Sequence, residues 1–277
     1  MFDAPALRGH TVLALHAHPD DEAIFTGITL RRLADAGIRV VLVVATAGDL
    51  GRSRIPLAPG ESIARRRILE LERSAALLGV ERLVLLGRRD SGLPGWASGT
   101  HARALAGADP LVLASRLADL ADAEGAATLL YDDEQGIYAH PDHRAAHHIG
   151  AITAELTGAT SYRITVDREH LHASAPGDHL VQHAAGAAQV GFGRVPGEIT
   201  LTVTGSAKHL AIKHAAITAH ASQVGADQVP TDRFGAAYGQ EWFVRCGPPG
   251  VLDSLGDAGP ATGAAVQWGG EPVSAAP

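Results

Sequence analysis

The sequence predicts an α/β protein in which a mostly parallel sheet is covered by helices on both faces, and three observations support this fold class. Short apolar runs alternate with segments whose apolar residues recur at helical spacing. A run as apolar as Thr11–Leu15 is typical of a strand buried on both faces of a parallel sheet. Polar clusters follow these runs directly, which is where ligands bind in such sheets.

The first strand, helix and second strand form one βαβ unit. The helix predicted over 22–36 is followed by Gly37, a residue type that commonly ends helices. The second strand is predicted over 38–45, and a unit of this length implies a right-handed crossover and a parallel strand pair. The first turn lacks a Gly-x-Gly-x-x-Gly sequence, so dinucleotide binding is not predicted.

The same criteria locate the remaining elements. Helices are predicted at 61–78 and 110–123, from His143 to Leu156, and from the cap Ser206 to Ser222. Strands are predicted at 82–86, 128–131, 161–166 and, with alternating polarity, 198–203. Residues 94–108 are expected to be irregular, and no element is predicted for 167–196. Residues 1–255 are predicted to form a single domain, and residues 256–277 a flexible tail rich in Gly, Pro and Ala.

Composition excludes several classes of partner. A net charge of −7 and a pI near 6.1 argue against nucleic acid or an anionic membrane as the main partner. The longest apolar run, 40–45, is far shorter than the roughly 20 residues that cross a bilayer. The N-terminus carries no secretory signal pattern, which predicts a cytoplasmic location. Cys246 is the single cysteine, so a metal would be bound by His and carboxylate side chains.

The first polar cluster, His16-Ala17-His18-Pro19-Asp20-Asp21-Glu22, follows the first strand. Pro19 fixes the direction in which the chain leaves the sheet before the next helix begins. Asp20 or Asp21 could simply cap that helix, but one cap is enough. Adjacent carboxylates beside a histidine repel each other unless a cation binds between them, which favours a metal site.

A second polar cluster, residues 132–143, follows the strand at 128–131. Because both clusters leave the same edge of one sheet, we expect His18, Asp21 and His143 to meet. Three protein ligands with a fourth position open to water is the pattern of catalytic zinc sites. A metal in such a site lowers the pKa of water to roughly 7, which generates a nucleophile near neutral pH.

The segments Ala-His-Pro-Asp-Asp-Glu (17–22) and His-Pro-Asp-His (140–143) resemble the paired signatures of the LmbE-like (PIG-L) N-acetylglucosaminyl deacetylase family. That family comprises zinc hydrolases with a Rossmann-like, three-layer αβα fold, and the resemblance covers about residues 10–225. It implies that His18, Asp21 and His143 bind the metal. It also implies that Asp20 is the general base and that His140 stabilises the oxyanion or acts as an acid.

Other positions resemble the family more loosely. Arg67 with Glu70, and Asp90, resemble residues that position the sugar, although Arg67 and Glu70 could equally form a surface pair three residues apart on a helix. Tyr138 resembles a tyrosine that contacts the reacting carbonyl. The late segment containing Lys213, His220 and Gln223 also resembles a family motif, for which we expect a role at the rim of the site or behind its ligands.

Six other histidines are not expected to be ligands. His147 and His148 are predicted to be ordinary helix residues. Four further histidines are predicted to lie on the surface: His170, His172, His179 and His183.

The sequence thus predicts a metal-dependent hydrolase that removes the acetyl group from an N-acetylglucosamine-type sugar. Zn²⁺ is the expected cofactor, with Fe²⁺ or another divalent ion as the alternative. The expected partner is a small amino-sugar substrate, with no nucleic acid and no membrane insertion, and a homo-oligomer is left open. Two alternatives remain: an amidase of the same family acting on a thiol conjugate or other non-sugar amide, and a sugar-binding relative without catalysis. An intact Asp20 argues against the second.

Overall fold

The computed structural model describes residues 9–229 and 231–258, whose strands form one sheet in the order β3-β2-β1-β4-β5-β7-β6-β8. Neighbouring strands from β3 to β5 are parallel: β1 (Thr11–His16), β2 (Arg39–Thr46), β3 (Arg82–Arg88), β4 (Ala126–Asp132) and β5 (Thr160–Thr165). The other strands extend the sheet by antiparallel pairing: β7 (Gln240–Cys246), β6 (Leu201–Thr204) and β8 (Asp257–Ala258).

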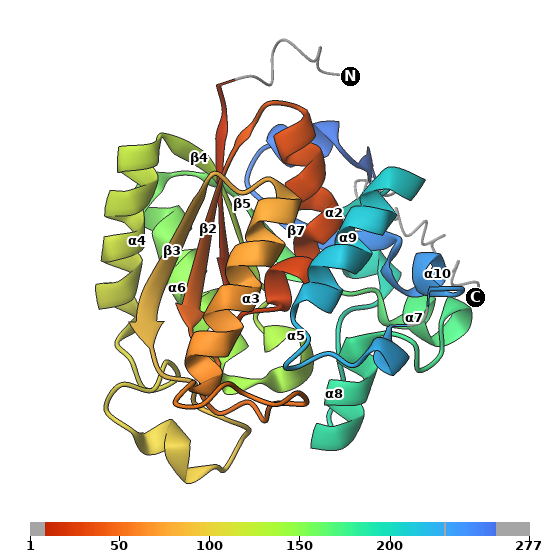
Figure 1. The fold of residues 1–277 in the computed structure, drawn as a ribbon. Coiled ribbons are helices and arrows are strands. Elements are labelled where there is room, and N and C mark those ends of the chain that lie inside the picture. The colour runs from red at the N-terminus through yellow and green to blue at the C-terminus, as the bar shows by residue number, and fades with distance from the viewer. Residues whose placement is uncertain (1–8, 230, 259–277) are drawn as a thin grey trace, which may run out of the picture.

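Helices cover both faces of this sheet (Figure 1). On one face lie α2 (Asp21–Asp35), α3 (Ile63–Leu78) and α9 (Ala207–Ala219), and on the other lie α4 (Pro110–Glu124) and α6 (Pro141–Thr157). Alternate residues of β1 point to opposite faces of the sheet. Val12 packs in the core under α2 and α3, and Leu13 packs in the core under α4 and α6. Both are fully buried, which explains why residues 12–15 of this strand are all apolar instead of alternating.

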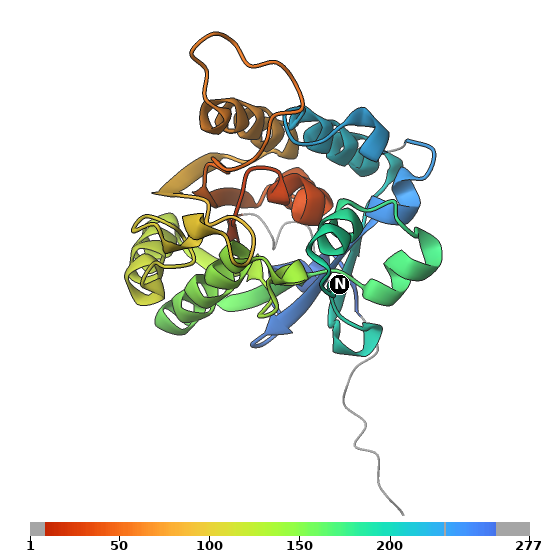
Figure 2. The ribbon, with the colours of Figure 1, turned by 90° about the horizontal axis from the view of Figure 1, so that it is seen from below.

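Shorter helices lie around the carboxyl-terminal edge of the sheet and beyond β5 (Figure 2). They are α5 (Gly136–Ala139), α7 (Arg168–Ser174), α8 (Leu180–Ala188) and α10 (Phe234–Tyr238). Single 3₁₀ turns are η1 (Ala97–Thr100), η2 (Pro196–Glu198), η3 (Ala226–Gln228) and η4 (Val251–Ser254). Within residues 9–229 and 231–258, no helix combines the length and apolar character that crossing a membrane requires.

The predicted α/β class with a mostly parallel sheet is confirmed, and the elements predicted before residue 166 agree with the structure to within a few residues. Strand β6 alternates as predicted, with Leu201 and Val203 buried. Two regions differ. Helices α7 and α8 occupy the segment for which no element was predicted, and β7 lies in the Gly/Pro-rich region after Gly225. Trp242 and Phe243 of β7 are buried in the core, so this strand is an integral part of the sheet.

Two smaller expectations are wrong. His179 is not on the surface: it is 2% exposed, caps α8 through Nδ1, which accepts a hydrogen bond from the backbone N–H of Val181, and stacks on Tyr238. The start of the predicted flexible tail, Asp257–Ala258, pairs with β6 as strand β8. The rest of that predicted tail, 259–277, lies outside the described residues.

Candidate metal centre and active-site pocket

The chain leaves β1 at His16 and begins α2 at Asp21, and the residues between them carry the first part of the site. Asp20 has φ 117° and ψ −28°, a left-handed conformation that is rare for a residue other than glycine. Its side chain makes no capping hydrogen bond to α2, so the simple N-cap interpretation fails for Asp20. Strained residues of this kind concentrate at functional sites because the surrounding structure must hold them in place.

The three expected metal ligands lie together. Asp21 bridges the two histidines, with Oδ2 3.6 Å from Nδ1 of His18 and Oδ1 3.6 Å from Nε2 of His143. All three side chains are buried. His140 joins them: one ligand atom each from His18, His140 and His143 lie within 4.8 Å of one another. A second group that satisfies the same distance limit consists of His18, Asp90 and Asp142.

Negative charge dominates this cluster. Burial lowers the pKa of His18, but the hydrogen bond to Asp142 and the negative charges of Asp21 and Asp90 outweigh burial and raise it well above its ordinary value. Burial also lowers the pKa of His143, and Asp21 and Asp132 reverse the effect. The carboxylates therefore attract positive charge at this point. A donor set of imidazole nitrogens and carboxylate oxygens without thiolate fits Zn²⁺ and also Fe²⁺.

Two buried carboxylates contact the histidines from behind. Asp132 Oδ2 lies 2.9 Å from Nδ1 of His143, and Asp142 Oδ2 lies 3.1 Å from Nε2 of His18. Asp142 Oδ2 also accepts the backbone N–H of Ser91 at 2.9 Å. Both aspartates belong to the second polar cluster, yet no role was predicted for them, because a motif names ligands and not the residues that orient ligands.

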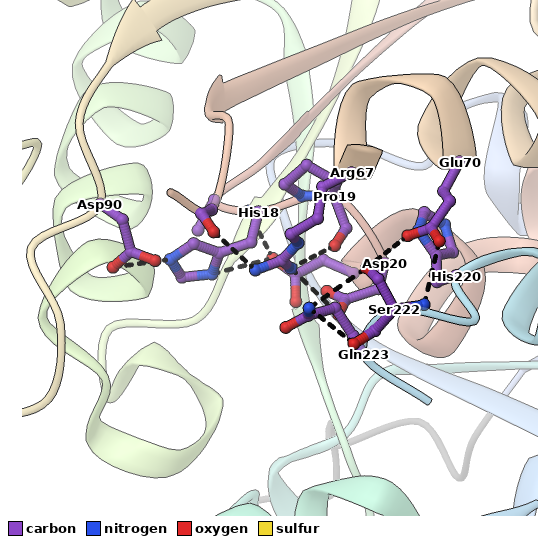
Figure 3. Close-up of polar contacts among 12 residues, drawn as sticks. His18, Pro19, Asp20, Arg67, Glu70, Asp90, His220, Ser222 and Gln223 are labelled. Atoms are coloured by element: carbon purple, nitrogen blue, oxygen red, sulfur yellow. Dashed lines mark hydrogen bonds and ion pairs between the residues drawn. The ribbon is translucent and has the colours of Figure 1, made fainter. Parts of the chain in front are cut away.

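Arg67, on α3, contacts Asp20 (Figure 3). It is not among the residues that line the pocket beside the candidate metal ligands. Its guanidinium donates to Asp20 Oδ2 at 3.1 Å, to the carbonyl of Pro19 at 2.5 Å and to the carbonyl of Gly48 at 3.2 Å. Gly48 has φ +58°, and a Cβ there would lie 2.1 Å from Arg67 Nη1, so glycine is required for this approach. All three of these contacts are with the protein, and the predicted contact of Arg67 with the sugar stays a prediction.

Burial raises the pKa of Asp20 to about 6, and the neighbouring Arg67 limits the increase. A carboxylate with a pKa in this range is ionised at neutral pH and can still accept and release a proton. Asp20 can therefore exchange a proton near neutral pH, and it lines a pocket beside these candidate metal ligands.

Tyr138 and His140 lie on a distorted segment. Ile137 and Ala139, which flank Tyr138, have φ 55° and 63°, and such values are unusual for a β-branched residue such as Ile137. The hydroxyl of Tyr138 lies 3.4 Å from Nε2 of His143, and burial raises the pKa of Tyr138 well above its ordinary value. Tyr138 is therefore a neutral hydrogen-bond donor directed at the centre.

His140 caps α6, because its Nδ1 accepts the backbone N–H of Asp142 at 3.2 Å. Burial, with the positive charge of His18 and His143, lowers the pKa of His140 to about 2. A neutral imidazole that accepts at Nδ1 carries its proton on Nε2. His140 can therefore donate a hydrogen bond from Nε2 to an oxygen atom.

A pocket of about 260 Å³ opens beside this cluster. Three of the predicted site residues line it: Asp20, Asp21 and Tyr138. Helix α8 and the segment after α9 supply most of the remaining wall: Leu180, Val181, His183, Ala184, Gln223, Val224 and Gln228. The wall from α8 was not predicted, because no apolar periodicity marks that helix in the sequence. Of the three residues singled out in the late segment, Lys213, His220 and Gln223, Gln223 is the one that lines this pocket.

The other two residues of this late segment, Lys213 and His220, are buried and do not lie at the rim of the pocket. Lys213 is 1% exposed and donates to Glu241 Oε1 at 2.7 Å, so it belongs to a buried ion pair and the rim role is wrong for it. His220 is fully buried. Glu70 accepts both the backbone N–H and the hydroxyl of Ser222, at 2.9 and 2.6 Å, which attaches this segment to α3 (Figure 3).

Two further acidic residues near the site, Asp133 of the second polar cluster and Asp90, have partners within the protein. Asp133 is fully buried and accepts from the hydroxyl of Thr165 at 2.7 Å, so it is not available to a sugar hydroxyl. Asp90 lies 3.8 Å from Nε2 of His18 and is 7% exposed. This position brings Asp90 next to the metal centre.

Comparisons with known proteins identify the family of this chain. The family model described as "PIG-L: GlcNAc-PI de-N-acetylase" matches residues 13–154. This range includes the predicted base, Asp20, and the three predicted metal ligands, which are His18, Asp21 and His143. A 1D-myo-inositol 2-acetamido-2-deoxy-alpha-D-glucopyranoside deacetylase from Salinispora arenicola is 30% identical over 245 residues, covering 81% of this chain and 79% of the relative. A deacetylase of the same name from Acidothermus cellulolyticus is 34% identical over 236 residues, covering 78% and 80%.

Solved structures share the fold. The A40926 pseudoaglycone deacetylase Dbv21 aligns with a TM-score of 0.58 at 17% identity, covering 86% of this chain and 98% of the other. The N,N'-diacetylchitobiose deacetylase of Pyrococcus horikoshii aligns with a TM-score of 0.53 at 22% identity, covering 85% and 83%. GalB, a 4-carboxy-2-hydroxymuconate hydratase, aligns with a TM-score of 0.54, so the fold alone does not define the reaction. On the family model and the curated relatives, the chain belongs to the PIG-L family of de-N-acetylases.

Proposed function

We propose that the protein is a metal-dependent N-deacetylase that hydrolyses the acetamido group of a small N-acetylglucosamine-type glycoside. One observation carries the proposal: Asp20 lines the pocket beside His18, Asp21 and His143 but is held by Arg67 and not by the metal-binding group. A binding protein does not need an additional carboxylate at this point. The family and the names of the relatives support the reaction class.

The metal centre that we propose consists of His18, Asp21 and His143, with Zn²⁺ as the expected ion and Fe²⁺ as the alternative. The raised pKa of both histidines supports it, since the surrounding carboxylates favour positive charge there. When bound, a divalent cation supplies Lewis acidity and lowers the pKa of water from 15.7 to about 7.

The protein side chains would perform the proton transfers and stabilise developing charge. Asp20 would accept the proton of the attacking water, since its pKa of about 6 leaves it ionised at neutral pH. The amide oxygen gains negative charge as the tetrahedral intermediate forms. His140, through Nε2–H, and Tyr138, through its hydroxyl, are the two donors that would stabilise that charge. Asp20 or His140 would then return a proton to the leaving amine.

Asp90 is proposed to bind a sugar hydroxyl, since it lies beside His18. For Arg67 we propose a different role from the one suggested by the family resemblance, namely to hold the carboxylate of Asp20. We further infer a single domain over residues 1–255, a cytoplasmic location and a small-molecule substrate.

An amidase acting on a thiol conjugate is the alternative that keeps the same centre, because the chemistry of amide hydrolysis is unchanged. The test is to incubate the purified, metal-loaded protein with a panel of acetamides and to measure both free amine and acetate. The panel contains 1D-myo-inositol 2-acetamido-2-deoxy-α-D-glucopyranoside, N-acetylglucosamine, diacetylchitobiose, an N-acetylcysteine conjugate and an acetylated peptide.

We expect the amino sugars to be cleaved with the highest kcat/KM. Faster cleavage of the cysteine conjugate or the peptide than of every amino sugar would contradict the sugar assignment. Binding of the sugars without release of acetate would contradict catalysis. The Asp20→Asn variant, prepared in the same way, is the control for a contaminating deacetylase. The asparagine side chain cannot accept the proton, so activity that belongs to this protein should fall in the variant, whereas activity of a contaminant would not.

A further inference from the structure

We propose that Glu22 is a positioning residue for Asp20, and that His220, at the far end of α9, holds Glu22 in place. The inference rests on the proposed role of Asp20 as the general base. It assigns a function to two buried side chains that neither bind the metal nor line the pocket.

Asp20 needs external support because its backbone conformation is unfavourable. At φ 117° the Cβ of an aspartate is crowded by its own backbone, and the residue persists in this state only where its surroundings enforce it. Arg67 holds the side chain of Asp20 through Oδ2. The main chain of Asp20 is held separately, because its N–H donates to Glu22 Oε2 at 2.9 Å.

Glu22 is itself fixed on three sides. Its Oε1 accepts from the hydroxyl of Ser74 on α3 at 2.5 Å, and lies 2.7 Å from Nε2 of His220 at the end of α9. Glu22 and His220 are both fully buried, so neither contact competes with water. The carboxylate thus uses one oxygen to join α2 to α3 and α9, and the other to hold the backbone of Asp20.

His220 is a fixed anchor for this contact. Its carbonyl accepts the backbone N–H groups of Gln223 and Val224, at 2.8 and 2.9 Å, and both of these residues line the pocket. The segment that forms the pocket wall therefore also determines where Glu22 lies. Glu22 connects that wall to the residue that we propose as the base.

Two substitutions of Glu22 distinguish the effect of its side-chain length from the effect of its charge. Glu22→Gln removes the charge but keeps the length, and its amide oxygen can accept from Asp20 while its NH₂ group faces His220. His220 can adapt, because its Nδ1 has no partner among the described residues and can take the proton. Glu22→Asp keeps the charge but is one methylene shorter, so it cannot reach Asp20 and His220 together.

We expect Glu22→Gln to retain kcat within about threefold, and Glu22→Asp to lose about 10- to 100-fold in kcat, the loss typical of a misplaced catalytic group. KM and bound metal per chain should stay near wild type in both. The opposite order, with Glu22→Asp active and Glu22→Gln impaired, would show that charge and not position matters. Equal kcat in all three proteins would also overturn the proposal.

Glu241→Asp is the matched control for loss of stability. Glu241 is 1% exposed, pairs with Lys213 and accepts the N–H groups of Ile28 and Thr29 on the same helix α2, but it makes no contact with Asp20. We expect this variant to melt at a lower temperature with kcat near wild type. If Glu241→Asp lowered kcat as much as Glu22→Asp, the effect would be a general one of helix α2.

Crystal structures of the wild type, Glu22→Gln and Glu22→Asp provide a readout that does not depend on activity. We expect Asp20 to keep its positive φ in the first two and to relax to a negative φ in Glu22→Asp. An unchanged Asp20 in Glu22→Asp would contradict the positioning role. A wild-type protein that cleaves no amino sugar would instead contradict the proposed function, and the φ angle of Asp20 would still test Glu22.

Discussion

Nδ1 of His143 lies 2.9 Å from Asp132 Oδ2, and neither side chain is exposed to solvent. The carboxylate of Asp132 therefore faces Nδ1 of His143, and Nε2 is directed at Asp21, 3.6 Å away. A carboxylate beside Nδ1 favours the tautomer with its proton there and raises the basicity of the ring, which makes Nε2 available to a cation.

Replacing Asp132 should therefore weaken metal binding without removing a ligand. We expect Asp132→Asn to lower the affinity for Zn²⁺ by about 10- to 100-fold. The measurement is competition with a chelator of known affinity. Thermal unfolding of both metal-free proteins is the control for misfolding, and an unchanged affinity would show that His143 needs no such partner.

Activity should depend on one divalent ion per chain, since the centre offers imidazole and carboxylate donors and the lone Cys246 lies elsewhere, on β7. Exhaustive chelation should abolish turnover, and added Zn²⁺ or Fe²⁺ should restore it. His143→Ala should lose most of the bound metal by elemental analysis. Full turnover in protein shown to be metal-free would rule out this mechanism.

The adjacent aspartates should give different mutant phenotypes. Asp20→Asn keeps the size of the side chain but cannot accept a proton, so kcat should fall by roughly 10²–10⁴ while metal content stays near wild type. Asp21→Asn should instead lose metal, with partial recovery of activity in excess metal. Metal analysis of the two variants decides between them, and the reverse pattern would exchange their roles.

Arg67 should set the acid limb of the pH profile. Asp20 acts only when ionised, so kcat/KM should fall as the pH drops through its pKa, which is about 6 in the metal-free protein. Arg67 lowers that pKa, and Arg67→Gln should therefore shift the acid limb to higher pH. A bound cation lowers the midpoint of the acid limb in the wild type and in Arg67→Gln alike, so the two proteins are compared with the same metal bound. A limb that stayed in place or moved to lower pH would argue against Asp20 as the titrating base.

The ion pair of Lys213 and Glu241 should matter for stability. Lys213→Met leaves Glu241 charged and buried, a change that costs about 3 kcal/mol or more. For a domain of this size, the melting temperature should fall by about 6–12 °C. Adding Glu241→Gln should recover part of the loss because it removes the uncompensated charge. Equal melting temperatures for wild type and Lys213→Met, measured by calorimetry, would show that the pair is neutral for stability.

Much of the fold is encoded in short-range patterns. The apolar run of β1, the helical spacing in α2 and the terminating Gly37 are each visible within a few residues, and the structure confirms the elements that they predict. Strand β7 and helix α8 escaped prediction for a physical reason. β7 is stabilised by pairing with β5 and β6, which lie far from it in the sequence. α8 forms one wall of the pocket, and the residues of the opposite wall are also distant in the sequence.

The site divides in the same way. The sequence by itself determined that His18, Asp20 and Asp21 leave one strand and that His140 and His143 follow another, because parallel strands bring their carboxyl ends to one edge of the sheet. Only the tertiary structure decided the partners of these residues. Arg67 contacts Asp20 across 47 positions of sequence, and His220 contacts Glu22 across 198. A buried charged group must find its counter-charge wherever packing supplies one, and that choice depends on the assembled helices and not on any local pattern.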